Sequence, residues 1–429
     1  MYFMHLIMMR QLSRIHRFFP VCNPHMTYSK DFITPSAATE NIRYAIREVT
    51  VLARQLEREG RRVLYLNIGD PNVYDFDLVD EAKDAAIWAL THQKNGYAPS
   101  EGVPEALAAI EKDAHERQHI GSIVGSFTGN GASECIDLAI TALANPGDNI
   151  LLPTPTYPLY ATILTRLNVE ARYYQLDESR DWEPDVEHMA TLIDDRTRAV
   201  VIINPNNPTG SVYSEESLRR VVALAKAHNL LIMNDEIYER LVLDADHQHV
   251  SLASLDEEAC VVTFNGLSKS YIGPGIRMGW GLLSGPRERL EAYFDTICRM
   301  LRARLCSSHI FQWAIKPCLE GGQSHLPGVL AKLRHRRDLC MQKIAQIPGL
   351  SCDCPRGAFY AFVRVEGVKD DAVWCRELLK SKGVVVVPGS GFGYHDDNAG
   401  YFRIVFLPEE EVLAEAFDKI AEFMSEQTV

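Results

Sequence analysis

Four short runs of apolar residues constrain the fold of this chain more than any other feature of its sequence. They occupy residues 149–152, 200–203, 230–233 and 261–264. Continuous apolar runs of this length are typical of strands that a sheet buries on both faces. Helical patterns such as 215–228 lie between the runs. The alternation predicts a large α/β domain whose central sheet is mostly parallel and is flanked by helices.

The pattern changes after about residue 310, where strands and helices mix and a smaller α+β domain is expected. An amphipathic helix over 38–59 and an apolar segment over 63–68 are expected to join this smaller domain. The expected helices and strands of the smaller domain cover 326–346, 358–363, 371–381, 384–387 and 402–406. The predicted organisation is a leader (1–26), an N-terminal segment that joins the small domain (27–67), a large domain (68–310) and a small C-terminal domain (311–429).

Charge and composition exclude several classes of protein. The chain has 44 basic and 57 acidic residues, a formal net charge of −13, which argues against a nucleic-acid-binding protein. It contains no run of 18 apolar residues, so no membrane-spanning helix and a cytoplasmic location are expected. Its ten cysteines are scattered along a long chain and are expected to be reduced. Cys352 and Cys354 form a C-x-C pair without a second pair nearby, so no metal site is predicted.

The first thirty residues are basic and contain no acidic side chain before Asp31. Such a composition is typical of an organelle transit peptide. Met26 opens an alternative N-terminus, so the preceding residues are also explained by an upstream start codon or by a disordered tail. The tail or the upstream start is the favoured interpretation.

The motif that points most clearly to chemistry is Ser268-Lys269, which follows the apolar run at 261–264. A glycine-rich segment comes next and carries Arg277, eight positions after the lysine. A lysine that forms a Schiff base needs surroundings that favour its neutral amine, and a nearby arginine can bind a phosphate dianion. The spacing therefore indicates a cofactor that is held by a lysine and carries a phosphate.

Polar residues end two further apolar runs. Residues 204–210 combine Asn, Pro, Thr and Gly, and Asp235 and Tyr238 follow the run at 230–233. An aspartate beside the ring nitrogen of pyridoxal phosphate (PLP) keeps that nitrogen protonated, and Tyr238 and Asn207 could both reach the phenolic oxygen of the ring.

Small residues at 128–134 lead into a predicted helix, where backbone N–H groups and the helix dipole favour a phosphate. The segment lacks the third glycine of a dinucleotide fingerprint, and so does the glycine-rich loop at 389–393. The strand-end motifs fall where parallel strands have their carboxyl ends, which is where open α/β sheets bind ligands.

Together these residues resemble the signature of class I/II aminotransferases, enzymes of the fold-type I PLP architecture. The resemblance rests on Lys269 with Arg277, on residues 207–210, on Asp235 with Tyr238, and on Arg403. It extends from about Ile42 to the C-terminus. Within the family, the segments 66–71, 206–210 and 402–407 are most similar to bacterial and archaeal alanine aminotransferases.

The resemblance implies a role for each matching residue in binding PLP. Lys269 holds the cofactor as a Schiff base and later acts as general base, Asp235 pairs with the ring nitrogen, and Asn207 and Tyr238 contact the phenolic oxygen. Tyr157 lies against the ring face. The phosphate is bound by Gly131, Ala132, Ser133, Ser268 and Arg277.

The resemblance also implies how substrates and subunits are bound. Arg403 binds the α-carboxylate of an amino acid or 2-oxo acid, with contacts from Gly69 and Asn207. Tyr97 reaches the phosphate of a neighbouring subunit in a homodimer. Arg304 lies near where the family can place a cation for the distal carboxylate of 2-oxoglutarate.

The expected reaction is transfer of the amino group of L-alanine to 2-oxoglutarate. Tyr157 stands where aspartate aminotransferases usually have tryptophan, and Gly266 stands where they often have serine, which argues against aspartate as donor. Alternatives in the same fold are an aspartate, aromatic or kynurenine-type aminotransferase and a lyase of the aminocyclopropane-carboxylate synthase type. A PLP-binding regulator would need a DNA-binding domain, and only about forty residues precede the resemblance.

Overall fold

The computed structural model describes residues 33, 36–39 and 45–427. The chain divides into two units, 1–42 and 43–429. In the first unit the structure describes a short 3₁₀ helix, η1 (Ala37–Thr39). The predicted leader (1–26) lies outside the described residues. The helix expected over 38–59 is α2 (Ala45–Arg58), and its predicted first residues belong to η1 instead.

An eight-stranded sheet forms the centre of the second unit, with the strand order β2-β9-β8-β7-β6-β3-β4-β5. The pairs β8–β7, β7–β6, β6–β3 and β3–β4 are parallel, whereas β2, β9 and β5 pair in antiparallel fashion. The strands are β2 (Ile123–Asn130), β3 (Asn149–Thr154), β4 (Glu170–Asp177), β5 (Glu183–Pro184), β6 (Thr197–Ile203), β7 (Leu231–Asp235), β8 (Val261–Gly266) and β9 (Met278–Ser284). The four predicted apolar runs are therefore strands of one mostly parallel sheet, as expected.

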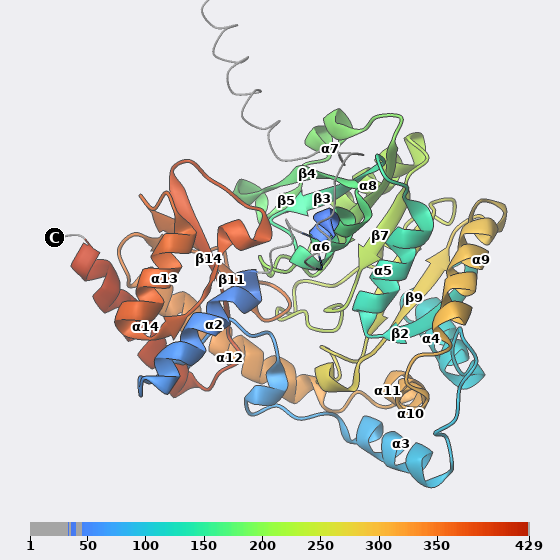
Figure 1. The fold of residues 1–429 in the computed structure, drawn as a ribbon, viewed down its shortest axis with the longest axis horizontal. Helices are drawn as coiled ribbons and strands as arrows, with labels where there is room; N and C mark the ends of the chain where they lie inside the picture. Colours follow the sequence, from blue (N-terminus) through green and yellow to red (C-terminus); the bar gives the residue numbers. More distant parts are fainter. Residues whose placement is uncertain (1–32, 34–35, 40–44, 428–429) are drawn as a thin grey trace, which may run out of the picture. The chain divides into compact units, whose positions relative to one another are not determined.

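Both faces of this sheet are buried, which explains why the strands are apolar throughout. In β6, Ala199, Val201 and Ile203 pack into a cluster with α5, α6 and α9, whereas Val200 and Ile202 pack into a cluster with α4, α7 and α8. Figure 1 shows α5 and α9 next to each other on one side of the sheet. The helices are α4 (Pro104–Glu116), α5 (Ala132–Leu143), α6 (Pro158–Leu167), α7 (Val186–Leu192), α8 (Glu215–Ala227) and α9 (Arg287–Arg304). The arrangement is a three-layer α/β/α fold.

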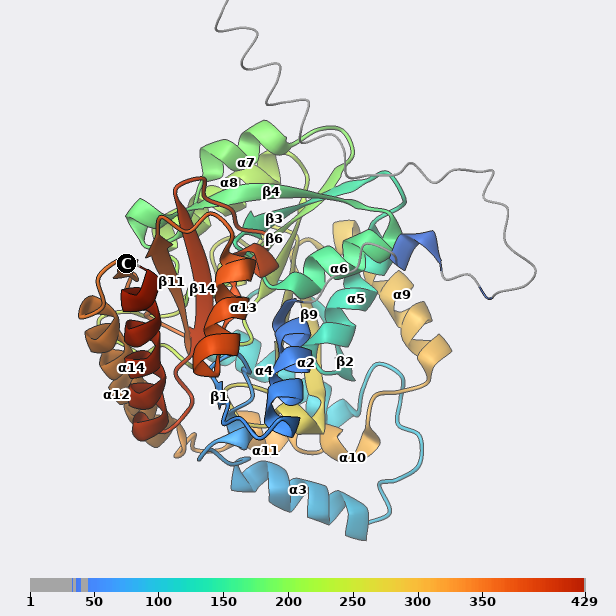
Figure 2. The same cartoon turned by 60° about the vertical axis from the view of Figure 1, so that its left-hand side comes forward.

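A second, antiparallel sheet has the order β10-β11-β14-β13 and lies among helices α12, α13 and α14 (Figure 1 and Figure 2). Its strands are β10 (Leu350–Ser351), β11 (Tyr360–Glu366), β13 (Val387–Pro388) and β14 (Ala399–Val405), and its helices are α12 (Leu326–Ala345), α13 (Asp371–Lys382) and α14 (Glu410–Gln427). The α+β part predicted from the sequence is present, with element bounds within a few residues of those expected.

The N-terminal segment of the second unit lies against the C-terminal part of the chain. Strand β1 (Leu64–Tyr65) pairs in parallel with β12 (Val384–Val385), and Ala53 and Leu56 of α2 pack on Leu379 and Val385. The helices α3 (Asp80–Thr91), α10 (His309–Gln312) and α11 (Ile315–Glu320) pack beside α4 or against one another.

Among the described helices, none is both long enough and apolar enough to span a membrane. The nine cysteines in the described part of the chain are free thiols.

Candidate active site

Asp235 occupies the last position of β7 and places a carboxylate at the carboxyl end of a parallel strand. Its side chain is buried, with one oxygen accepting a hydrogen bond from the backbone N–H of Ile237 at 3.3 Å and the other from the hydroxyl of Tyr160 at 3.1 Å. Burial raises the pKa of Asp235 to about 6, although these two hydrogen bonds lower it. The carboxylate is therefore costly to ionise and is well placed to pair with a cation.

Lys269 lies three residues beyond β8 and faces the same region. Its Nζ donates a hydrogen bond to the backbone oxygen of Gly69 at 2.7 Å. Burial lowers the pKa of Lys269 to about 8, and the charges of Asp70, Arg403, Arg277 and Asp235 also act on the amine. The predicted site residues Asp235, Arg277 and Arg403 therefore all influence this amine, which lies 5.5 Å from the ring centre of Phe359 and 6.0 Å from that of Tyr238. A depressed pKa makes the neutral, nucleophilic form of the amine accessible near neutral pH.

Arg403 lies in the middle of β14 and is almost fully buried, with 1% of its surface exposed. The guanidinium donates to the backbone oxygen of Asn67 at 2.7 Å and to the side-chain oxygen of Asn207 at 3.0 Å. Its central carbon is 4.5 Å from the ring centre of Tyr360 and 4.8 Å from that of Phe392. Hydrogen bonds and aromatic rings thus fix the orientation of this buried cation.

The loop after β6 is held by its own side chains. Asn206 accepts hydrogen bonds from the N–H and hydroxyl of Thr209 and donates to the hydroxyl of Tyr213 at 2.9 Å. Gly210 has φ +74°, and a Cβ there would lie 2.6 Å from Cβ of Pro355, so only glycine fits. With Asn206 holding the loop, the neighbouring Asn207 is left to bind Arg403.

Tyr238 and Tyr360 share a hydrogen bond of 2.7 Å between their hydroxyl groups. Both side chains are buried, and burial raises the pKa of Tyr238 well above its usual value. A Cβ at Gly69 would collide with the hydroxyl of Tyr360, which accounts for glycine at that position. The pair places two phenol groups next to the residue that binds the Lys269 amine.

The turn from β2 into α5 is shaped around Arg277. Gly131 has φ +78°, and a Cβ at this position would collide with the Arg277 guanidinium. Arg277 donates to the backbone oxygens of Pro274 at 3.0 Å and Asn130 at 3.3 Å. A Cβ at Gly279 would collide with the backbone of Ala132, so β9 approaches the start of α5 closely.

The remaining predicted cofactor residues are near this turn or near Asp235. Ala132 and Ser133 open the first turn of α5, and Ser268 is buried beside Lys269. Tyr157 precedes α6 as its N-cap, and the proximity of its hydroxyl adds to burial in raising the pKa of Tyr160 and Tyr238.

Two predicted site residues, Tyr97 and Arg304, do not contact Lys269, Asp235 or Arg403 among the described contacts. Tyr97 is 82% exposed. Arg304, at the end of α9, donates to the backbone oxygen of Thr128 at 2.7 Å and pairs with Glu134 at 3.4 Å. Among the described contacts, those of Arg304 lie at the turn between β2 and α5, not beside Arg403.

Several residues that contact this site were not identified from the sequence. Tyr160, Tyr360, Phe392 and Phe359 belong to segments whose aromatic side chains resemble ordinary core residues. Asn67 binds Arg403 through its backbone oxygen. The one available signal was Tyr160, three positions after Tyr157 and so on the same side of a helix as that predicted residue.

The residues present fit a planar, cationic ring with a phosphate group. Backbone N–H groups in the first turn of a helix largely lack acceptors within it, and at the start of α5 these groups and Arg277 together favour an anion. The buried Asp235 carboxylate favours a protonated ring nitrogen, and the low pKa of Lys269 favours attachment of an aldehyde. These features lie at neighbouring strand ends of one sheet.

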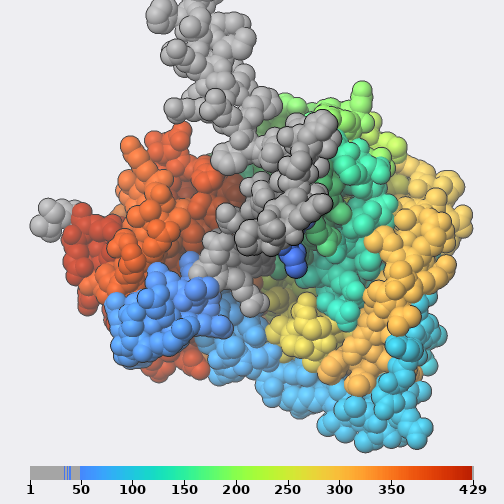
Figure 3. Space-filling view, viewed as in Figure 1, coloured from blue at the N-terminus to red at the C-terminus, as the bar shows by residue number. Residues whose placement is uncertain are grey.

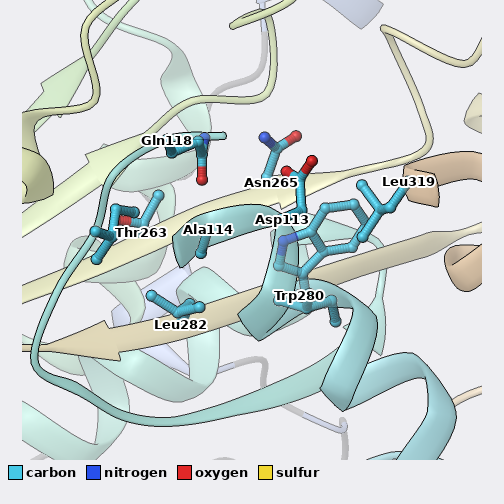
Figure 4. Close-up of a pocket in the computed structure, with 10 residues that line it drawn as sticks. Asp113, Ala114, Gln118, Thr263, Asn265, Trp280, Leu282 and Leu319 are labelled. Atoms are coloured by element: carbon cyan, nitrogen blue, oxygen red, sulfur yellow. The ribbon is translucent and has the colours of Figure 1, made fainter. Parts of the chain in front are cut away.

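Two other hollows lie away from these residues. A small enclosed cavity between α4 and strands β8 and β9 leaves about 10 Å³ for the centre of a water molecule, room for about one water. Figure 4 shows Asp113 of α4 and Asn265 of β8 near Trp280 of β9 in its wall. A wider hollow is lined by residues at the amino ends of β6 and β7, including Thr197 and Leu231. Neither is lined by a predicted site residue.

Comparisons with known proteins agree with this site. Residues 62–420 match the family model described as aminotransferase class I and II. The glutamate-pyruvate aminotransferase AlaA of Escherichia coli K12 is 38% identical over 403 residues, which cover 92% of this chain and 98% of that protein. The alanine aminotransferase of Mycobacterium tuberculosis H37Rv is 37% identical over 403 residues, covering 91% and 92%.

The solved structure of an alanine aminotransferase from Pyrococcus furiosus superposes with a TM-score of 0.88 at 35% identity, covering 92% of this chain and all of that one. The family match includes both sheets, and it includes Asn67, Gly69 and Asn207, which bond to Arg403 or Lys269. The chain therefore belongs to the class I and II aminotransferases, with the fold-type I architecture, and is a pyridoxal-phosphate-dependent transaminase.

Proposed function

We propose that this transaminase transfers the amino group of L-alanine to 2-oxoglutarate and so forms pyruvate and L-glutamate. The names of its relatives support this substrate pair. The observation that carries the site assignment is how three charged groups are placed. The Lys269 amine bonds to Gly69, which adjoins Tyr360, the Tyr360 ring lies 4.5 Å from the Arg403 guanidinium, and the Asp235 carboxylate ends β7. These supply a nucleophilic amine, a partner for a ring cation and a partner for a carboxylate.

PLP would be held by two groups of residues. Asp235 would accept the ring N–H, Tyr238 and Asn207 would contact the phenolic oxygen, and Tyr157 would cover the ring. The phosphate would be bound by Gly131, Ala132, Ser133, Ser268 and Arg277. When bound, PLP withdraws electrons from the α carbon of the substrate and weakens its C–H bond.

Lys269 moves protons in this proposal. The neutral form of its amine predominates above pH about 8 and is still populated near neutral pH. This neutral amine takes the proton from the α carbon of the substrate, and the protonated amine gives the proton back later in the reaction. The backbone oxygen of Gly69 accepts a hydrogen bond from the amine and so restricts the rotation of Nζ. Positioned general-base catalysis of this kind contributes ~10²–10⁴ in rate.

Arg403 binds the α-carboxylate that all the substrates share. Its guanidinium is already oriented by Asn207 and Asn67 and is shielded from water by Tyr360 and Phe392, so little is reorganised when a carboxylate arrives.

We also propose that the enzyme is a homodimer in which Tyr97 reaches the phosphate of the partner. Support comes from exposed apolar side chains in two segments. One segment is the second half of α3 and the residues after it, and the other is the end of α9; the side chains are Ile87, Trp88, Leu90, Tyr97 and Leu305. The two segments are in contact, since Ala98 N–H donates to Cys306 Sγ and the rings of Trp88 and Trp313 lie 5.2 Å apart. Figure 3 shows them as adjoining light-blue and amber surfaces. Exposed apolar surface of this kind favours a protein partner.

The four-part organisation predicted from the sequence remains a proposal, with the small domain including the segment that carries β1. The packing of α11 beside α4 favours placing the boundary after α11 and before α12. A cytoplasmic location is supported by the free thiols, which suit a reducing compartment.

A screen of amino donors and 2-oxo acceptors tests the proposed reaction. Alanine with 2-oxoglutarate is expected to give the highest kcat/KM among alanine, aspartate, valine and an aromatic amino acid. An aromatic donor that exceeds alanine tenfold would replace the proposal with an aromatic or kynurenine-type activity. Release of ammonia or a cyclic product without amino transfer would replace it with a lyase.

A further inference from the structure

Tyr160 lies in the first turn of α6 and points into the sheet. The helix begins with Pro158, which fixes the backbone at its first position, and Tyr157 is its N-cap. Tyr160 follows Tyr157 by three positions, so both side chains leave the helix on the side that faces the end of β7. Tyr160 has no exposed surface, and its hydroxyl donates a hydrogen bond to Asp235 at 3.1 Å.

The hydrogen bond from Tyr160 restricts rotation about the last side-chain bond of Asp235. The carboxylate of an aspartate rotates in a broad, two-fold potential about its last side-chain bond. In Asp235 one oxygen accepts from the N–H of Ile237 and the other accepts from Tyr160. Two donors on different oxygens fix the plane of the carboxylate, and an ionised carboxylate has lone pairs left for a third donor.

We propose that Tyr160 is a positioning residue that holds the Asp235 carboxylate ionised and in the plane in which it meets the PLP ring nitrogen. The inference rests on the proposed role of Asp235. A hydrogen bond from a neutral phenol to a buried carboxylate stabilises the charged form, and without it burial would favour the neutral acid more strongly. A neutral acid at this position does not balance the charge of a protonated ring.

Packing alone does not account for the tyrosine. The ring of Tyr160 lies in the apolar cluster formed by α5, α6 and the sheet, where phenylalanine would fill nearly the same space. Its hydroxyl is the part that packing does not require, and that hydroxyl contacts Asp235. The direction of the effect agrees, since burial raises the pKa of Asp235 and the hydrogen bond from Tyr160 lowers it.

The test is PLP affinity of the full-length Tyr160→Phe protein, measured by equilibrium dialysis between about pH 5 and about pH 8. The dissociation constant is expected to rise roughly tenfold or more, because hydrogen bonds to charged groups are strong ones. The acid limb of the affinity-against-pH curve is expected to move to higher pH, because the Asp235 carboxylate then binds its proton more readily. An unmoved acid limb overturns the proposal.

Tyr174→Phe is the matched control. Tyr174 also has no exposed surface, and its hydroxyl donates to the backbone oxygen of Val201 at 2.7 Å. The control removes a buried hydroxyl and one hydrogen bond from the same sheet but leaves Asp235 untouched. PLP affinity and its acid limb are expected to stay as in the wild type, and an equal loss in both variants would show a merely structural effect.

Combining Tyr160→Phe with Asp235→Asn separates the two hypotheses. Asp235→Asn alone is expected to weaken PLP binding, and adding Tyr160→Phe should then change the affinity less than about twofold. If Asp235→Asn leaves the affinity unchanged, the proposed role of Asp235 fails and the positioning role fails with it. If Asp235→Asn weakens binding but Tyr160→Phe costs the same in both backgrounds, only the positioning role fails.

Discussion

Arg403 donates a hydrogen bond to the side-chain oxygen of Asn207 at 3.0 Å, although the two residues are 196 positions apart. Arg403 belongs to the antiparallel sheet and Asn207 follows a strand of the mostly parallel one. The contact therefore joins the two sheets at the place where the substrate carboxylate is proposed to bind. A change in the relative position of the two sheets would therefore move the guanidinium of Arg403 relative to Asn207.

Arg403→Ala is expected to lower kcat/KM at least about tenfold for every amino donor alike. A hydrogen bond to a charged group contributes about 1.5–3 kcal/mol, and the α-carboxylate is common to all donors. Arg364→Ala is the control, because Arg364 lies on the neighbouring strand β11 but is partly exposed and pairs with Glu366 at 3.9 Å. Steady-state kinetics with four donors decides the matter, and a loss confined to one donor would contradict a shared carboxylate site.

Lys269→Ala is expected to keep the fold and lower kcat by at least the ~10²–10⁴ of general-base catalysis. Borohydride reduction of the wild-type protein should fix PLP to Lys269, as peptide mapping would show. Because burial lowers the pKa of Lys269 to about 8, the rate at which PLP attaches should rise with pH and level off above about 8.

Lys382→Ala is the matched lysine control, since its amine pairs with Glu422 and Glu426 on the surface. It should retain both PLP attachment and turnover. Near-wild-type turnover in Lys269→Ala would refute the assignment of the lysine.

The sequence predicts the sheet well because burial on both faces leaves a local trace. Ala199 to Ile203 face two helix layers in alternation, so the whole run must be apolar. The polar residues that end these runs, Asn207 and Asp235, are also local signals. Parallel strands bring their carboxyl ends to one edge, so these residues can be expected to meet before any contact is known.

The contacts that complete the site leave no such trace. Arg403 bonds to the backbone oxygen of Asn67 across 336 positions, and a backbone oxygen has no sequence signature. Tyr160 and Tyr360 stand among apolar residues, where an aromatic side chain is most often part of the core. The hydroxyl of Tyr160 bonds to Asp235 and that of Tyr360 bonds to Tyr238. Both partners are distant in the sequence, so these contacts can be recognised only once the fold is known.

Mixing inactive Tyr97→Ala and Lys269→Ala subunits is expected to restore activity. In a C₂ dimer the hybrid has one site with both defects and one with neither, so random mixing should recover about a quarter of wild-type activity. The exposed position of Tyr97 suits a side chain that completes a partner's site. Activity is measured after the subunits are exchanged under mild denaturation. Remixing Lys269→Ala with itself is the control, and a fully active monomer would contradict the shared site.

Arg304→Ala is expected to lower kcat/KM for alanine and glutamate to a similar extent. Its donors bind Thr128 and Glu134 at the turn proposed to hold the phosphate, so its loss should weaken PLP binding for every substrate. The sequence-based prediction, that Arg304 binds a distal carboxylate, requires a selective loss with glutamate and 2-oxoglutarate. Comparing the two amino donors at one fixed, subsaturating PLP concentration distinguishes these outcomes.

The pH dependence of stability should reveal the buried Asp235 carboxylate. Burial raises its pKa to about 6 in the folded protein, above the value of about 3.8 in the unfolded chain. The folded state therefore holds the proton more tightly, and its stability falls as pH rises through this window. A shift of this size corresponds to about 3 kcal/mol. In protein stripped of PLP, Asp235→Asn should thus be more stable than the wild type above about pH 6.

Asp75→Asn should show the opposite sign and serves as the control for Asp235→Asn. Burial raises the pKa of Asp75, but hydrogen bonds from Arg336 and Lys332 outweigh burial and lower this pKa to about 2. Its carboxylate therefore stabilises the fold above about pH 4, and that contribution is lost as pH falls toward 2. Urea unfolding of both variants and the wild type between about pH 4 and about pH 8 measures the differences. A stability difference for Asp235→Asn that does not vary across this range would show that the carboxylate is not titrating there, and the burial argument for its pairing with a ring cation would fail.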